Sequence, residues 1–125
     1  MGQTILIVED DKDLRENICS ILQNEGFQTT EAQNGTQALD KLLPSVSLVI
    51  LDIMMPGIDG LEATRRIRAL DREDAATTPI IAVSANAFAD DRRLSREAGM
   101  DAHLSKPVSS QELVEALAHI AADAS

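Results

Sequence analysis

Three carboxylates follow two short apolar runs, and each stands where a buried strand would end. Glu9 and Asp10 come directly after residues 5–8, and Asp52 comes directly after residues 48–51. Carboxylates brought to about 4 Å from one another repel by roughly 4 kcal/mol per pair at an effective dielectric constant near 20. Such a cluster requires a cation, and Mg2+ suits one or two carboxylates together with water and phosphate oxygens. These residues therefore predict a carboxylate site for a hard divalent ion.

Two more polar residues stand at the ends of expected strands. Ser84 comes after residues 80–83, and Lys106 follows residues 103–105. A carboxylate beside a metal ion and a lysine is a competent nucleophile towards phosphorus, because the two cations offset charge on the phosphoryl oxygens while Asp52 attacks in line. The serine hydroxyl is a suitable donor to a phosphoryl oxygen. We therefore predict an aspartyl phosphate on Asp52, and we expect this carboxylate to be presented to solvent rather than buried.

The apolar runs alternate with stretches in which apolar residues recur at helical spacing. We expect strands over residues 4–8, 27–31, 48–51, 80–83 and 102–104. We expect helices that carry Leu14 to Leu22 and end at Gly26, and helices over 38–43, 61–70, 89–98 and 111–122, with Asn34-Gly35 as a turn. Strands without polar alternation, separated by helices, predict an α/β fold with a (βα)5 order and a five-stranded parallel sheet covered on both faces. In such sheets ligands bind outside the carboxyl ends of the strands.

Each candidate residue also has a simpler interpretation. Asp10 could cap the first helix, Asp52 could cap the turn that follows it, Ser84 could be an ordinary hydrogen-bonded hydroxyl, and Lys106 could be a solvated surface charge. Four separate strand ends nevertheless carry the residue types that phosphoryl transfer needs. That agreement favours the functional interpretation.

Composition excludes several classes of function. The net charge is -10, there is no Trp or Tyr, and Cys19 is the only cysteine. We therefore expect no nucleic-acid binding by this chain and no membrane binding, since phosphate backbones and anionic lipid are repelled and stacking side chains are scarce. A thiolate metal cage is impossible, and Cys19 is expected to be a small core residue. We expect one soluble cytoplasmic domain over residues 1–125, without a leader or spanning segment.

Four motifs together resemble the receiver domain of two-component response regulators. They are residues 5–11, residues 51–60, Ser84-Ala85 and Ser105-Lys106-Pro107. The resemblance implies a flavodoxin-like, three-layer fold and a phosphorelay function in which Asp52 accepts a phosphoryl group. The donor would be a histidine kinase or a histidine phosphotransfer protein. The phosphorylated form would change its binding to a downstream protein, or to a linked output or kinase domain, on the face formed by the last helices.

The same resemblance assigns roles to the other site residues. Ser84 and Lys106 would contact the phosphoryl group. The Mg2+ ligands would be Glu9, Asp10, Asp52 and the backbone carbonyl of Met54. Such a domain is not a turnover enzyme, although it catalyses its own phosphorylation and is expected to catalyse its dephosphorylation.

Two positions of the predicted switch depart from the family pattern. Position 84 is Ser where Thr is commoner, and position 103 is His where an aromatic residue usually lies. Ser84 keeps the hydroxyl but lacks a methyl group that packs during switching. Activation would therefore use His103 in a different way or use backbone shifts.

Two other classes of protein fit the sequence less well than a receiver domain. Haloacid-dehalogenase-like phosphatases place a second Asp two residues after the nucleophile, but here Met54 stands there, so turnover of phosphate esters is expected to be poor. A pseudo-receiver that has lost the chemistry would not need to retain all the polar residues named above. Residues 82–92 and 97–101 are closest to receivers of hybrid histidine kinases, although stand-alone regulators share them. The sequence is compatible with a stand-alone regulator and with a piece of a longer protein.

Overall fold

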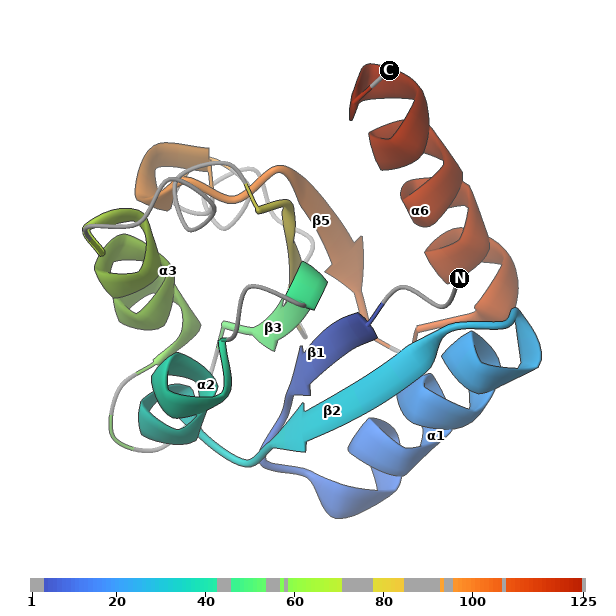
Figure 1. Cartoon of the computed structure of the whole chain (residues 1–125), viewed down its shortest axis with the longest axis horizontal. Coiled ribbons are helices and arrows are strands. Elements are labelled where there is room, and N and C mark those ends of the chain that lie inside the picture. The colour runs from blue at the N-terminus through green and yellow to red at the C-terminus, as the bar shows by residue number, and fades with distance from the viewer. Residues whose placement is uncertain are drawn as a thin grey trace.

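A single parallel sheet organises the chain (Figure 1). The computed structural model describes residues 4–42, 46–53, 57, 59–70, 78–84, 93, 96–106 and 108–124, with side chains to residue 118. Its strands are β1 (Thr4–Val8), β2 (Gln28–Ala32), β3 (Val46–Asp52), β4 (Ile80–Ser84) and β5 (Ala102–Ser105), in the spatial order β2-β1-β3-β4-β5. The chain runs outward from β1 in both directions, so a topological switch point lies between β1 and β3. Ligands of open α/β sheets bind at the carboxyl ends of strands beside such a point.

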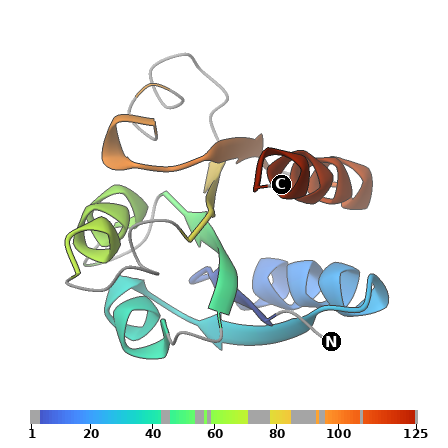
Figure 2. The same ribbon diagram turned by 45° about the horizontal axis from the view of Figure 1, so that its top comes forward.

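Helices cover both faces of this sheet, as the sequence predicts. They are α1 (Lys12–Asn24), α2 (Gly35–Lys41), α3 (Gly60–Arg68) and α6 (Ser110–Ala124). Figure 2 shows α1 and α6 together on one face and α2 with α3 on the other. The expected three-layer α/β architecture with a five-stranded parallel sheet is therefore confirmed.

Alternate residues of the central strands supply the two cores. Leu6 and Val49 pack in the cluster that also contains residues of α2 and α3. Ile7 and Ile50 pack in the cluster that contains residues of α1 and α6, where Cys19 is buried as expected. Because successive strand residues point to opposite faces, one continuous apolar run serves both layers. This explains why the strands lack polar alternation.

Helices α1, α2 and α3 begin at acidic or amide caps. Asp11 accepts hydrogen bonds from the amides of Asp13 and Leu14 at the start of α1. Asn34 accepts from the Gln37 amide and begins α2, so the turn expected at Asn34-Gly35 was wrong. The same side-chain chemistry that favours turns also satisfies the free amides of a first helical turn, and here the helix uses it.

Part of the predicted fourth helix lies outside the described residues. Arg93 and residues 96–98 are helical, and Gly99 follows them with φ of +109°, in agreement with a helix that ends there. Among the described residues, no helix combines the length and apolar character that crossing a membrane requires.

Candidate functional site

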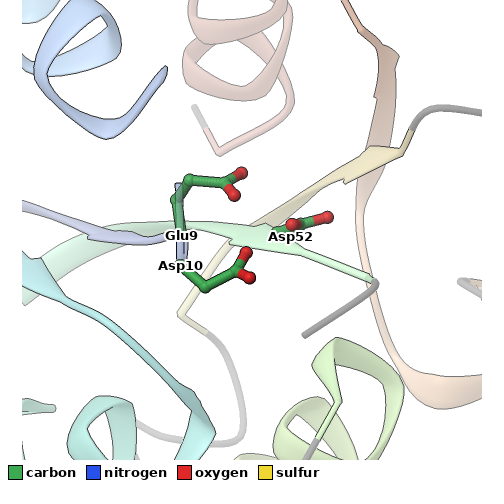
Figure 3. Close-up of side chains that lie close together, drawn as sticks. All are labelled: Glu9, Asp10 and Asp52. Atoms are coloured by element: carbon green, nitrogen blue, oxygen red, sulfur yellow. The ribbon is translucent and has the colours of Figure 1, made fainter. Parts of the chain in front are cut away.

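The three predicted carboxylates meet at the carboxyl ends of β1 and β3. Glu9 and Asp10 follow β1 directly, and Asp52 is the last residue of β3. One carboxylate oxygen from each of these residues lies within 4.8 Å of the other two. Figure 3 shows the three side chains gathered at this edge of the sheet. The expected clustering is thus present, and it follows from the parallel pairing of β1 with β3.

Burial differs from the expectation. Asp52 is only 2% exposed and Glu9 only 1% exposed, whereas Asp10 is exposed. The prediction that Asp52 is presented to solvent was wrong, because β3 continues through Asp52, which pairs with Val83 of β4. The start of α3 also covers the backbone here, since a Cβ added to Gly60 would lie 2.2 Å from the Asp52 carbonyl oxygen.

Lys106 supplies the positive charge of the site. Its amide donates to the Ser84 carbonyl at 2.8 Å, which fixes the chain just after β5. Its Nζ lies 3.2 Å from Asp52 Oδ2 and 3.4 Å from Glu9 Oε2. The alternative that Lys106 is a solvated surface charge does not fit this geometry. The ammonium group joins the two buried carboxylates.

The charges of this cluster shift the ionisation of its members. Burial, together with the nearby carboxylates of Asp52 and Asp10, raises the pKa of Glu9 from 4.5 to about 8, although the Asp11 amide acts in the opposite direction. Burial alone would lower the pKa of Lys106, but Asp52 and Glu9 outweigh it and raise that pKa above its usual value. The site therefore holds an excess of negative charge that its own lysine only partly offsets.

The structure describes some of the remaining predicted residues and not others. Ser84 ends β4, is buried, and pairs in register with Ser105, next to the Asp52–Val83 pair. His103 is half-buried in β5 opposite Ala82. Asp10 does not cap α1, because Asp11 performs that role, so the Asp10 carboxylate is left to the cluster. Met54, Ala85 and Pro107 lie outside the described residues.

One residue beside the site was not singled out from the sequence. Arg15 of α1 is buried, and its Nη1 donates to the Glu9 carbonyl oxygen at 2.8 Å. Its Nε donates to Glu31 Oε1 on β2 at 2.9 Å. The sequence carries a sign of this role, since Arg15 occupies the same helical stripe as the buried residues Ile18 and Leu22.

The donor set suits a hard, oxygen-preferring cation. The oxygens of Glu9, Asp10 and Asp52 come from adjacent strand ends, and Asp10 is open to solvent that could complete an octahedral shell. Glu9 Oε2 is buried and accepts no hydrogen bond among the described residues, although it contacts Lys106. A divalent cation would satisfy this oxygen and lower the repulsion among the carboxylates.

Known proteins resemble this chain in sequence over most of its length. The response regulator receiver domain family matches residues 5–118. The transcriptional regulatory protein CpxR of Escherichia coli is 38% identical over 110 residues, which are 88% of this chain and 45% of that protein. CssR of Bacillus subtilis is 39% identical over 114 residues, 91% of this chain and 49% of its own length. The chain thus spans less than half the length of these curated relatives.

Solved structures of response regulators and receiver domains have the same fold as this chain. The receiver domain of a sensor histidine kinase from Pseudomonas aeruginosa PAO1, solved with a magnesium ion in its active site cleft, is 36% identical with a TM-score of 0.85, and the match covers 95% of this chain and 97% of that one. A putative response regulator from Chloroflexus aurantiacus is 33% identical with a TM-score of 0.88, and the match covers 98% and 99% of the two chains. Sequence, fold and site agree that the chain belongs to the response regulator receiver domain family.

Proposed function

We propose that this receiver domain accepts a phosphoryl group on Asp52 in a Mg2+-dependent reaction. The observation that carries the proposal is the contact of Lys106 Nζ with Asp52 Oδ2 at 3.2 Å, beside the cluster of Glu9, Asp10 and Asp52. The magnesium-containing receiver from Pseudomonas aeruginosa supports the choice of metal. In this proposal Glu9, Asp10, Asp52 and the Met54 carbonyl are the metal ligands.

The proposed reaction follows from the charges of the site. Asp52 attacks the phosphorus of a phosphohistidine, an O–P bond forms, and the P–N bond breaks with its electron pair leaving on the imidazole. Lys106 lies where it can offset charge on the transferred group, and the Ser84 hydroxyl is proposed to donate to one of its oxygens. Bound Mg2+ would supply further charge stabilisation and in-line orientation of the phosphoryl group. The domain performs this transfer on itself and its later hydrolysis, and it does not turn over small phosphate esters.

The partners in this proposal are a histidine kinase or a histidine phosphotransfer protein upstream and a protein or linked output domain downstream. Both transcriptional regulators and a sensor kinase receiver occur among the relatives, so either arrangement suits a domain of this family. Phosphorylation would alter binding on the face of the last helices, with Ser84 and His103 as the switch positions. No nucleic-acid or membrane partner is proposed for these residues.

Intact mass spectrometry tests the phosphoacceptor. The protein is incubated with acetyl phosphate and Mg2+, beside an Asp52→Asn variant and a sample with EDTA. One labile phosphoryl adduct that requires both Asp52 and Mg2+ is the expected result. If wild-type protein stays unmodified with acetyl phosphate and also with a phosphorylated histidine phosphotransfer protein, the chain is a binding module without the chemistry.

A further inference from the structure

Hydrogen bonds from groups outside the carboxylate cluster hold both the backbone and the side chain of Glu9. Its amide donates to the Ala32 carbonyl of β2 at 3.1 Å, and its carbonyl accepts from Arg15 Nη1 at 2.8 Å. Its Oε1 accepts from the Asp11 amide at 3.1 Å. Glu9 is therefore fixed in the metal-free chain, and Arg15 is the one side chain among the described contacts that holds its backbone.

Arg15 is itself held in place. It is 8% exposed, and Glu31 on β2 accepts its Nε at 2.9 Å. A guanidinium presents its donors in a rigid plane, so fixing Nε on Glu31 also fixes the direction of Nη1. Glu31 on β2 therefore holds the Arg15 guanidinium in place while that guanidinium donates to the Glu9 carbonyl at the end of β1.

We propose that Arg15, anchored by Glu31, is a positioning residue for the metal site. By holding the carbonyl of Glu9 it sets the orientation of the Glu9–Asp10 peptide and hence the directions of two of the three carboxylates. This inference rests on the proposed Mg2+-dependent function. Partners that orient metal ligands through hydrogen bonds commonly contribute about tenfold or more to metal affinity.

A purely electrostatic role makes the opposite prediction. Arg15 carries a positive charge near a site that binds a cation, so removing that charge alone would strengthen Mg2+ binding. A positioning role predicts weaker binding when Arg15 is lost. The direction of the change therefore distinguishes the two roles.

A matched control distinguishes positioning of the metal ligands by Arg15 from a general contribution of Arg15 to the stability of the fold. Arg68 of α3 is a partly buried arginine that also donates to backbone, namely to the carbonyls of Thr78 and Gly99 at 2.7 and 2.8 Å. These contacts lie before β4 and β5, at the opposite edge of the sheet from the carboxylates. Arg68→Met should lower thermal stability but leave Mg2+ affinity unchanged.

The experiment measures Mg2+ affinity by isothermal titration calorimetry for wild type, Arg15→Met, Arg68→Met, Glu31→Ala and Glu31→Gln. We expect Kd to rise about tenfold in Arg15→Met, with a smaller rise in Glu31→Ala. Glu31→Gln, which keeps an acceptor for Arg15 but removes the charge, should bind like wild type. In Arg15→Met the phosphorylation rate of Asp52 should recover at saturating Mg2+, since the defect lies in holding the metal.

Each alternative outcome has a defined meaning. An unchanged or lower Kd in Arg15→Met refutes the positioning role, as does an equal rise of Kd in Arg68→Met. If Arg15→Met does not fold, Glu31→Ala decides the matter, because Glu31 is about half exposed and its loss removes the anchor of Arg15 while the arginine itself is retained. An unchanged Kd in Glu31→Ala would then refute the positioning role. Absence of Mg2+ binding and of phosphorylation in wild type would instead refute the proposed function.

Discussion

Replacing Glu9 with Gln should remove most of the pH dependence of stability that the metal-free site creates. Glu9 is 1% exposed, and burial raises its pKa from 4.5 to about 8. Each unit of such a shift corresponds to about 1.4 kcal/mol, so ionised Glu9 costs the folded state roughly 5 kcal/mol relative to the unfolded chain. Glutamine keeps a similar shape without the ionisable proton.

The sign of the effect follows from proton binding. Between pH 4.5 and about 8 the folded chain keeps the Glu9 proton while the unfolded chain releases it, so the free energy of unfolding falls as pH rises. Above the folded pKa both states are ionised and this contribution becomes constant. The pKa of Lys106 is raised from 10.5, so its contribution is fully present throughout this window and is lost only at higher pH.

Urea denaturation measures the free energy of unfolding at each pH. Far-UV circular dichroism is the signal, because the chain contains no Trp or Tyr for a fluorescence assay. Wild type, Glu9→Gln and a control Glu16→Gln are compared in EDTA from about pH 5 to 8.5, a range that spans the expected window. Glu16 lies on the exposed side of α1, so its variant should follow wild type. Glu9→Gln should gain stability over wild type as pH rises, by up to about 5 kcal/mol. If the free energy of unfolding has the same pH dependence in wild type and Glu9→Gln, Glu9 is not the source of the loss of stability at higher pH.

Three further variants probe the surroundings of the site, and a fourth, Gly26→Ala, serves as a control for one of them. Lys106→Met should slow phosphorylation of Asp52 at saturating Mg2+ by about 100-fold, measured by intact mass; a rate equal to wild type would exclude a role for its contact with Asp52. Gly60→Ala should lower the free energy of unfolding by about 3 kcal/mol, because the new Cβ would meet the Asp52 carbonyl at 2.2 Å. Gly26→Ala, strained only by its φ of +95°, should cost about 1 kcal/mol in the same denaturation assay, and equal losses would contradict the steric argument. Asp11→Ala should cost about 1 kcal/mol as a lost helix cap without weakening Mg2+ binding in calorimetry, and a large loss of affinity would show that Asp11 does more than cap α1.

The meeting of the site residues at one edge of the sheet was predictable, because it depends on the parallel direction of the strands. Parallel strands place their carboxyl ends at one edge of a sheet, and β1 pairs directly with β3, so Asp10 and Asp52 approach one another whatever the loops between them do. Lys106 follows the same rule, although its contact with both buried carboxylates needed the strand order to be known. The core was predictable for a related reason, since strands that are apolar on both faces must be covered on both faces.

The burial of Asp52 was not predictable from its place after an apolar run. It results from pairing with Val83, which is distant in the sequence, and from the close approach of Gly60 at the start of α3. An apolar run reveals neither contact. Arg15 was missed for a similar reason: its acceptors are a carbonyl of β1's end and a carboxylate of β2. A helical pattern shows that Arg15 faces inward, but it does not show which groups meet it.

The burial of the carboxylates gives the site its response to ligands. Three ionised carboxylates and one ammonium would leave an excess of two negative charges, which matches the charge of one divalent cation. Protonation of Glu9 reduces that excess in the metal-free chain, so a bound cation would release this proton and bind more tightly as pH rises towards about 8. The backbone around Glu9 is fixed beforehand by β2 and Arg15, so little of the binding free energy is needed to order the ligands. The chain therefore separates two tasks: hydrogen bonds fix the geometry of the site, and its unbalanced charge provides the attraction for what binds there.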